Sequence, residues 1–464
     1  MAGRSPTLHA PPKRQTASSH GGAVAWREGV YPALYLLLEC SRPTVGSLRV
    51  SLRGVSRVEV GRGERRDTAR DGDHGLRLTV PDPWMSGCHA ELACALGEWT
   101  IRDAGSRNGV VRNGERVTCA ALVDGDVLEI GHTFFVFVAK EPDPATEIAA
   151  LGELQTYHRE LAIEMRALAK LAPSRVSVML FGETGTGKEV VARAIHTASR
   201  RTGPFIAINC SAIPASLIES ELFGHAKGAF TGATDSSPGV VRAADGGTLF
   251  LDEIAELSLA AQASLLRVLE ESEVRPLGAA HAIPVDLRTI TATHRSLDAL
   301  ARDGRFRQDL LARLAGYAVE LPGLRARRLD LGNLCAALLT RFAPDGAAAA
   351  RPSLTRAAVR ALIAHDWPHN VRGLAKALET ALVLGGGEID LVHLPPDVRA
   401  SAARGLAPAT LLGVNETQHR DQLVALLRLH KGNVAVVARE LGKAAMQVRR
   451  WVRKYGIDLA SFRP

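Results

Sequence analysis

The pattern of apolar and polar residues divides the chain into three regions. From about residue 31 to 139, short apolar runs are separated by turn signals, which are Arg62-Gly63, Asn108-Gly109, Asn113-Gly114 and Asp124-Gly125. Short strands bounded by such turns predict an all-β domain. From about residue 147 to 399, apolar runs of strand length alternate with amphipathic segments, which predicts an α/β domain followed by helices. The last region, 411–464, has a helical and basic pattern.

Polar stretches separate these regions. Residues 140–146 (KEPDPAT) and 401–410 (SAARGLAPAT) predict linkers, because they are rich in residues that interrupt helices and strands. Residues 1–30 are basic and lack the apolar stretch of a signal peptide, so we expect a disordered leader. The domains expected are therefore 31–139, 147–399 and 411–464.

Composition narrows the partners. A net charge of +8 makes a polyanion such as nucleic acid worth considering, although an Arg-rich composition alone would give the same value. The six cysteines form no CxxC pair, which indicates reduced thiols in a cytoplasmic protein. The apolar run at 31–38 is too short to span a bilayer, so we expect no membrane partner.

A phosphate-binding loop follows the first strand of the α/β region. The apolar run at 176–181 (VSVMLF) leads into GETGTGK at 182–188, where a helical pattern begins. In this strand-to-helix context, backbone N–H groups and a lysine bind phosphates. A glutamate follows the lysine, where the general pattern has Ser or Thr for magnesium. The nucleotide contacts expected are Gly182, Glu183, Thr184, Gly185, Thr186, Gly187, Lys188 and Glu189.

A second strand ends in two carboxylates. The run at 248–251 is followed by Asp252 and Glu253, and such a pair suits magnesium binding and water activation. A DE pair alone is usually a solvated strand end. Together with the phosphate-binding loop, it predicts a nucleoside triphosphatase.

A family signature lies between these two motifs. Residues 219–233 read ESELFGHAKGAFTGA, and the last six are Gly228, Ala229, Phe230, Thr231, Gly232 and Ala233. This hexapeptide resembles the signature loop of sigma-54-dependent transcription activators of the NtrC class. The plain alternative is a flexible Gly/Ala surface loop. The resemblance extends over about 176–384 and implies an ATP-hydrolysing AAA+ ring, commonly a hexamer, that contacts sigma-54 RNA polymerase through this loop.

The same resemblance implies roles for individual residues. Asp252 would hold Mg²⁺, Glu253 would orient the attacking water, and Asn209 would couple this glutamate to the nucleotide state. Arg307 and Arg313 match arginine fingers that act in trans, where they would offset charge on the transferred phosphoryl group.

The resemblance also implies a sensor arginine in the helical lid, and the sequence departs from the family pattern at a few positions. Arg372, in WPHNVRGL, matches the sensor arginine of the lid. His294 stands where the family usually has Asn, and Gly373 replaces a usual Glu. Ala226-Lys227 precedes the signature loop, where an acidic residue is common. None of these departures removes a catalytic group.

The C-terminal region predicts a DNA-binding helix-turn-helix. Asn433 can cap a helix through Leu441, Gly442 ends it, and a second helix is expected over about 445–454. The segment resembles the Fis-type helix-turn-helix of the same activators. A basic, solvated terminal helix is the alternative. The residues expected to contact double-stranded DNA are Gln447, Arg449, Arg450 and Lys454, whereas Val448 and Trp451 should pack inward.

The β-rich region resembles a forkhead-associated (FHA) domain, a β-sandwich that binds phosphothreonine peptides. Arg62 and Ser86 match the phosphate contacts, Asn108 matches the residue that holds the peptide backbone, and His89 matches a loop brace. Gly87 stands where the family often has Arg, and Arg107 offers a replacement cation. A sandwich kept only for docking is the alternative.

The combined expectation is a sigma-54-dependent activator with phosphothreonine input, whose phosphorylated partner is a Ser/Thr kinase or its substrate. Two rivals remain. One is an AAA+ regulator that binds DNA without contacting sigma-54. The other is a phosphopeptide scaffold with a degenerate ATPase, against which the presence of Lys188, Asp252, Glu253, Arg307 and Arg313 argues.

Overall fold

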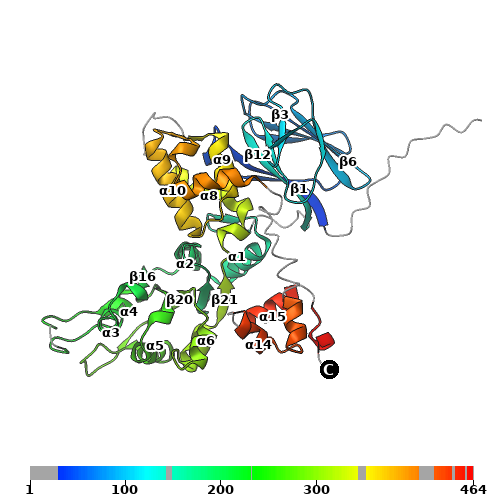
Figure 1. Ribbon diagram of the computed structural model, residues 1–464. Coiled ribbons are helices and arrows are strands. Elements are labelled where there is room, and N and C mark those ends of the chain that lie inside the picture. The colour runs from blue at the N-terminus through cyan, green and yellow to red at the C-terminus, as the bar shows by residue number, and fades with distance from the viewer. Residues whose placement is uncertain are drawn as a thin grey trace, which may run out of the picture.

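The computed structural model describes residues 30–142, 149–230, 233–342, 352–406, 423–441, 445–454 and 457–462. Residues 1–29 of the expected leader, residues 143–146 of the first expected linker with 147–148, and residues 407–422 lie outside these described residues. The described chain forms a β-sandwich, an α/β domain, a helical lid and a small C-terminal helical unit (Figure 1).

The β-sandwich consists of two six-stranded sheets with a shared core. The first sheet has the order β2 (Leu48–Ser51), β1 (Val30–Glu39), β12 (Thr133–Pro142), β11 (Val127–Ile130), β8 (Val110–Arg112) and β9 (Glu115–Val117). The second has the order β10 (Cys119–Ala121), β7 (Glu98–Asp103), β6 (Ala90–Ala95), β3 (Arg57–Arg62), β5 (Gly75–Val80) and β4 (Asp67–Asp71). The all-β prediction for this region is confirmed, and its turns place the candidate peptide loops at one end of the sandwich.

The α/β domain is built on a five-stranded parallel sheet. Its order is β16 (Phe205–Asn209), β17 (Thr248–Asp252), β20 (Arg288–Thr293), β15 (Val178–Phe181) and β21 (Tyr317–Glu320). Its helices are α1 (Arg159–Leu171), α2 (Lys188–Ser199), α3 (Ile218–Phe223), α4 (Gly239–Ala243), α5 (Leu259–Glu271), α6 (Leu297–Arg302) and α7 (Gln308–Leu314). Two short hairpins, β13–β14 (Ala149–Leu151, Leu154–Thr156) and β18–β19 (Glu273–Val274, Ile283–Pro284), complete it.

Strand alternation explains how this sheet is covered. Val178 and Leu180 point to the side of α1 and α2, whereas Met179 joins the core formed with α5 and α7. Because both faces are buried, the strands read as continuous apolar runs. The carboxyl ends of the parallel strands meet at one edge, where ligands bind in open α/β sheets.

The described part of the lid, residues 331–342 and 352–406, contains four α-helices and a short strand pair. These are α8 (Leu331–Phe342), α9 (Arg356–Ala364), α10 (Asn370–Leu384), α11 (Pro396–Ser401), β22 (Ser353–Leu354) and β23 (Glu388–Ile389). The packed chain extends beyond the expected boundary at 399, because residues 402–404 form a 3-10 turn and Leu406 is buried. Residues 401–406 of the stretch interpreted as a linker therefore belong to the lid. The alanine-rich stretch at 347–350 lies outside the described residues.

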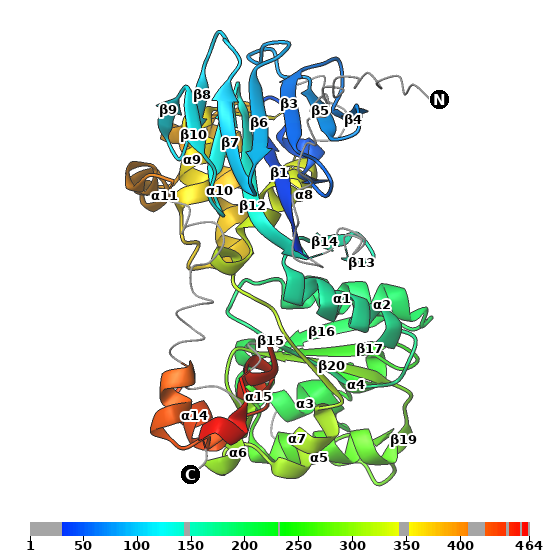
Figure 2. The ribbon, with the colours of Figure 1, turned by 90° about the vertical axis from the view of Figure 1, so that its right-hand side faces the viewer.

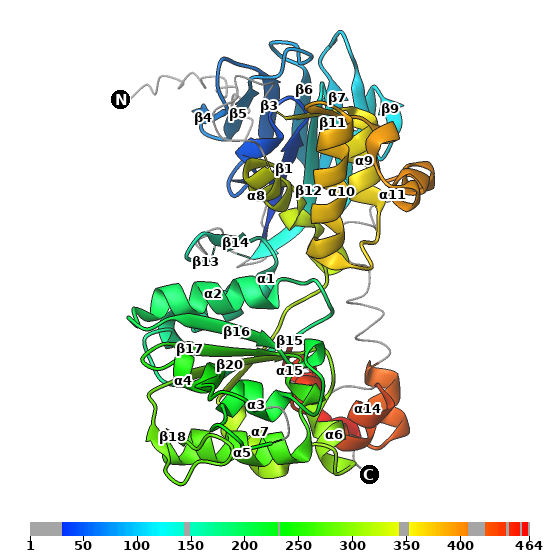
Figure 3. The same ribbon diagram turned by 90° about the vertical axis from the view of Figure 1, so that its left-hand side faces the viewer.

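The sandwich lies against the lid rather than apart from it (Figures 2 and 3). Side chains of β1 and β12 form one apolar core with α8, α9 and α10. Both parts stand at one end of the α/β domain.

The C-terminal unit has the helix positions expected from the sequence. Residues 423–429 are helical, α14 spans Val434–Glu440, and α15 spans Ala445–Lys454. The Asn433 side chain caps α14 by accepting from the N–H groups of Ala435 and Val436, at 3.1 and 3.3 Å. Val448 is fully buried and Trp451 packs against the same core, as predicted.

Candidate active site

The phosphate-binding loop adopts a backbone that only glycine tolerates at its bends. Gly182, Gly185 and Gly187 have φ values of 151°, 80° and 100°, and Gly187 is the N-cap of α2. The N–H groups at this helix start face the loop and offer positive potential for an anion. A Cβ on Gly185 would lie 2.4 Å from the carbonyl oxygen of His369, so the lid rests directly on the loop.

Lys188 is buried at the base of this loop. Its Nζ donates to the carbonyl oxygens of Gly182 and Glu183, at 3.0 and 3.3 Å. Burial lowers the pKa of the ammonium, while the nearby carboxylates of Glu253 and Asp252 act to raise it. A buried ammonium beside two carboxylates is suited to exchange its carbonyl partners for phosphate oxygens.

The two carboxylates lie at the carboxyl end of β17, as predicted. Burial raises the pKa of Asp252, with Lys188 acting in the opposite direction. Glu253 has a φ of 52°, which is strained for a non-glycine residue and turns its carboxylate away from the strand. Such strain is typical of functional positions, and here it occurs at a carboxylate that interacts electrostatically with Lys188 of the loop.

His294 and Asn209 take different positions around Glu253. Nδ1 of His294 lies 2.9 Å from Oε2 of Glu253. Asn209 is next to Asp252 in the strand register, but its side chain accepts from the N–H and the hydroxyl of Ser211, at 2.9 and 2.7 Å. In this structure, therefore, the histidine contacts the glutamate and the asparagine caps a turn.

Lid residues that the sequence did not single out also reach the loop. Nδ2 of Asn370 donates to the carbonyl oxygen of Thr184 at 3.0 Å and to Glu183 at 3.1 Å. The Arg325 guanidinium pairs with Glu183 at 2.6 Å. The guanidinium of Arg327, which is buried, donates to the carbonyl oxygen of Thr186 at 2.6 Å. No local motif marks these contacts, because they join residues more than 140 positions apart.

Arg372 and Glu189 lie at the edge of the same site. The backbone N–H of Arg372 donates to Gly185, and its charge acts to lower the pKa of Lys188. Glu189 pairs with Arg193 at 2.7 Å on the exposed side of α2, and its charge acts to raise the pKa of Asp252. The structure thus brings the expected sensor arginine and all the loop residues together.

The two expected arginine fingers are on α7 and its N-cap. Arg307 is partly exposed and makes two hydrogen bonds to Asp309, at 3.0 and 2.7 Å. Arg313 is exposed and donates to the carbonyl oxygen of Leu269. Within the described residues, neither contacts the phosphate-binding loop of its own chain, so a role in catalysis requires a second subunit.

The signature loop joins α3 to α4. Phe230 is 39% exposed and its ring contacts the His225 ring edge-on, with centroids 5.0 Å apart. The N–H of Gly228 donates to the carbonyl oxygen of Ala233 and closes the loop at its base. Thr231 and Gly232 lie outside the described residues. Phe230 is therefore not a core residue.

A second segment supports the base of this loop. Between β18 and β19, Leu277 exchanges backbone hydrogen bonds with Gly224 and Ala226, at 2.8 and 2.9 Å. Gly278 approaches Ala229 so closely that a Cβ would lie 3.0 Å from its side chain. The sequence analysis did not identify this contact, which brings together segments about 50 residues apart.

The candidate peptide loops converge at one end of the sandwich. Arg62 is exposed, and its backbone N–H donates to Ser86. The Ser86 hydroxyl accepts from the N–H of Arg107 at 3.3 Å, and Asn108 donates to the carbonyl oxygen of Trp84 at 2.6 Å. His89 is fully buried and bonds to the N–H of Ser86 and the carbonyl of Gly109, which fits the expected brace.

Helix α15 carries all four expected DNA contacts. Arg449 is exposed. The side chains of Gln447, Arg450 and Lys454 lie outside the described part of the structure.

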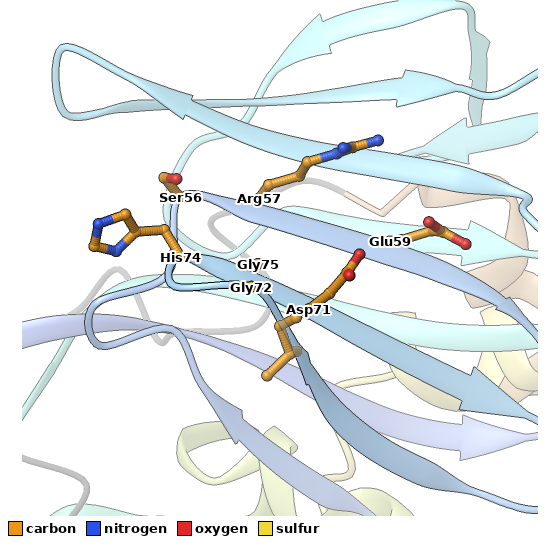
Figure 4. Close-up of a pocket in the computed structure, with 8 residues that line it drawn as sticks. Ser56, Arg57, Glu59, Asp71, Gly72, His74 and Gly75 are labelled. Carbon is orange, nitrogen blue, oxygen red and sulfur yellow. The ribbon is translucent and has the colours of Figure 1, made fainter. Parts of the chain in front are cut away.

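A pocket of 330 Å³ lies elsewhere on the sandwich (Figure 4). It is lined by residues of β3, of the end of β4, of β5 and of the turn between β4 and β5, including Arg57, Asp71 and His74. None of the expected site residues lines it. No helix in the described part of the chain is both long and apolar enough to cross a membrane.

The fold and the site define a P-loop ATPase of the AAA+ class that carries an FHA domain. Residues 154–320 match the sigma-54 interaction domain, residues 325–410 the AAA+ ATPase lid domain, and residues 58–131 the FHA domain. The transcriptional regulatory protein ZraR of Escherichia coli (strain K12) is 45% identical over 314 residues, which cover 68% of this chain and 70% of that protein. The chain belongs to this family of sigma-54-interacting transcriptional regulators.

Other relatives match over similar lengths of the chain. The acetoin catabolism regulatory protein of Cupriavidus necator is 42% identical over 333 residues, and this chain spans about half of it, with 68% of this chain and 49% of that protein covered. A crystal structure of NtrX from Brucella abortus in complex with ADP is 28% identical, with a TM-score of 0.48 and coverage of 66% of this chain and 70% of that one.

Proposed function

We propose that the chain is a sigma-54-dependent transcription activator. In this proposal an oligomeric AAA+ ring, with a hexamer as the expected form, hydrolyses ATP to remodel the closed complex of sigma-54 RNA polymerase. The FHA domain reads a phosphothreonine protein, and the C-terminal helices bind DNA. The observation that carries the proposal is that Asp252 and Glu253 interact electrostatically with Lys188 at the phosphate-binding loop. The same domain also exposes Phe230 of the signature loop.

The donor set at the loop fits ATP with magnesium. The glycine backbone and the start of α2 would hold the phosphates, with Lys188 at the terminal ones. Asp252 supplies a hard carboxylate oxygen, the kind of ligand that Mg²⁺ prefers, and would hold the ion. When bound, the ion would neutralise charge on the phosphates.

Glu253 would orient the attacking water. Its carboxylate is held by His294 at 2.9 Å and is 13% exposed, so solvent can reach it while its direction stays fixed. Arg307 and Arg313 would supply positive charge to the site of a neighbouring subunit. In that role Arg307 would leave Asp309, a change that an exposed pair allows at small energetic cost.

The signature loop is suited to contact a protein partner. Phe230 offers a large apolar side chain that its own domain leaves exposed, and the loop lies between α3 and α4, close in sequence to the strand that carries Asp252. A partner can be remodelled only if the loop binds it differently in different nucleotide states.

Capture of sigma-54 tests the proposal directly. The full chain, with a transition-state ATP analogue, should retain sigma-54 in a pull-down, and ADP should not support capture. Thr231→Ala should abolish capture and transcription activation while ATPase activity and DNA binding stay largely intact. The matched control is Thr234→Ala, just beyond the signature loop.

Failure of the wild-type chain to capture sigma-54 would favour the rival regulator that acts on DNA alone. Failure of nucleotide hydrolysis as well would favour the phosphopeptide scaffold.

A further inference from the structure

The outer face of the first FHA sheet is apolar and covered. In β1, Leu34 and Leu36 face the sandwich core, yet Tyr35 and Leu37 on the opposite face are only 1% and 0% exposed. A sandwich sheet with one face in water alternates apolar and polar residues, and this one does not. The outer side chains pack instead with the lid, where α8 and α9 supply the opposing core. This face is therefore built for the lid of the same chain.

Polar contacts fix the orientation of this interface. The Arg360 guanidinium of α9 donates two hydrogen bonds to the Glu129 carboxylate of β11, at 2.7 and 2.6 Å. Glu129 is 1% exposed. Removing the partner of a buried carboxylate strongly destabilises the folded protein, because an uncompensated charge stays buried. On α8, Asn333 accepts from the N–H of Ser47 at 2.8 Å. The domain cannot slide on the lid without breaking these bonds.

The candidate peptide loop is joined to the same interface. Asp82, four residues before Ser86, accepts from the N–H of His132 at 2.7 Å, and the Trp84 ring stacks on the His132 ring at 4.6 Å. The carbonyl oxygen of His132 accepts from Cys40, whose own carbonyl accepts from the N–H of Leu354 in the lid, at 3.0 and 2.8 Å. The loop that would close on a peptide thus rests on the strands that contact the lid.

The lid contacts the nucleotide loop on its other side. Asn370 and Arg325 both bond to Glu183, whose carbonyl oxygen is one of the two partners of Lys188. A phosphate that binds Lys188 would lie beside these two carbonyl oxygens or replace one of them, next to the glutamate that the lid residues hold. A movement of the phosphate-binding loop would therefore alter its hydrogen bonds with Asn370 and Arg325 of the lid.

We propose that the FHA domain and the lid act as one rigid unit, which links phosphothreonine-peptide binding at Arg62, Ser86 and Asn108 to nucleotide binding at the phosphate-binding loop. This inference rests on the proposed peptide binding. Linkage is reciprocal, so nucleotide changes peptide affinity by the same factor as peptide changes nucleotide affinity. The two sites need no direct contact, because the lid contacts the phosphate-binding loop and is joined to the peptide loop through Cys40 and His132.

Gly332 provides a means to separate the two domains. It lies in α8, and a Cβ there would be 1.8 Å from the carbonyl oxygen of Leu37 and 2.3 Å from the Ser47 hydroxyl. Gly332→Leu would therefore push the FHA domain off the lid, while a helix favours leucine over glycine. The matched control is Arg341→Ala, on the exposed side of the same helix.

The first experiment measures the linkage in the full chain. A fluorescent phosphothreonine peptide, chosen as the tightest binder from a peptide library, is titrated without nucleotide, with ADP and with a transition-state ATP analogue. We expect its Kd to differ by about fivefold or more between nucleotide states in the wild type and in Arg341→Ala. In Gly332→Leu the peptide and the nucleotide should each still bind, but the Kd should no longer depend on nucleotide. A nucleotide-independent Kd in the wild type, or full linkage in Gly332→Leu, would overturn the inference.

A second experiment needs no peptide. Hydrogen exchange of the backbone amides at 82–89 and 131–138 should change when the ATP analogue binds to the wild type. Arg360→Glu should remove this response, and Glu129→Arg in the same chain should restore part of it by exchanging the charges. If no phosphothreonine peptide binds but the exchange response is present, the proposed peptide function fails and the rigid unit stands. If peptide binds and the exchange does not respond, the rigid unit is wrong.

Discussion

Nδ1 of His294 lies 2.9 Å from Oε2 of Glu253 and gives the candidate catalytic carboxylate its side-chain partner. The two residues directly follow the neighbouring parallel strands β20 and β17, so their contact follows from the strand order. An ionised glutamate has only acceptors, so Nδ1 must carry the proton in this contact. The histidine therefore holds the Glu253 carboxylate through its Nδ1–H group.

Removing this donor should slow hydrolysis rather than nucleotide binding. For His294→Ala we expect kcat for ATP hydrolysis to fall at least about tenfold, since a hydrogen bond to a charged group contributes ~1.5–3 kcal/mol. His294→Asn should keep most of the activity, because the asparagine Nδ2 is attached to Cγ as Nδ1 is. The measurements are steady-state kcat and the Kd of a fluorescent ADP analogue. Equal losses of kcat in His294→Ala and His294→Asn would show that the hydrogen bond to Glu253 is not what the imidazole contributes to hydrolysis.

The two charged groups at the loop should separate binding from hydrolysis. Lys188→Ala should lose nucleotide binding, because no other loop side chain offers a flexible cation to the terminal phosphates. Glu253→Gln should bind ATP but hydrolyse it slowly, since an amide cannot accept the proton of the attacking water. Equilibrium binding and single-turnover hydrolysis distinguish the two effects. Normal turnover in either variant would reject the assignment of the site.

The sequence was sufficient for what is local in the chain. The residues of the phosphate-binding loop are contiguous, so their spacing alone predicts the turn that Gly182, Gly185 and Gly187 make. The carboxylates at 252–253 follow a strand that is recognisable from its apolar run. Likewise, Asn433 caps its helix through its own side chain, within three residues.

The contacts that the sequence did not predict depend on packing between distant segments. Asn370 reaches Thr184 across 186 positions, and no spacing rule connects them. One signal was present but was interpreted only in part. The continuous apolar run at 31–38, with no alternation, indicates a strand buried on both faces, and the run at 133–139 repeats it. Those two runs anticipate the covered sheet face against the lid.

The FHA loops should recognise phosphate through Arg62. Its guanidinium is exposed beside Ser86, and it can form charge-assisted hydrogen bonds to a dianionic phosphate. Arg62→Ala in the full chain should weaken phosphothreonine-peptide binding by ~1.5–3 kcal/mol, the contribution of hydrogen bonds to charged groups. Arg65→Ala is the matched control, since that arginine is exposed three residues further on. Equal binding of phosphorylated and unphosphorylated threonine peptides on a peptide array would contradict phosphothreonine recognition by the FHA domain.

Position 87 holds glycine where FHA domains often have arginine. If Arg107 supplies the missing positive charge, it should contribute to phosphopeptide binding together with Arg62. Its N–H already bonds to the Ser86 hydroxyl at 3.3 Å, so its backbone is held at the loop. Arg107→Ala should therefore weaken the same peptides, and Arg107→Lys should restore much of the affinity because a point charge suffices at an exposed position. Fluorescence anisotropy with one peptide series measures both variants. An Arg107→Ala variant with wild-type affinity would leave Arg62 as the principal cation.

The C-terminal helices should bind DNA through α15. A small helix-turn-helix binds weakly alone, so two-fold sites are expected. Arg449 is exposed on this helix, whereas Arg439 is exposed on α14 and serves as the charge-matched control. Arg449→Ala should weaken binding, and the dependence of log K on log salt should become shallower by about one if the arginine contacts phosphate. Arg449→Lys separates the alternatives, because lysine keeps a phosphate contact but loses the two-point recognition of guanine. Equal effects of Arg439→Ala and Arg449→Ala would mean that α15 is not the element that reads DNA.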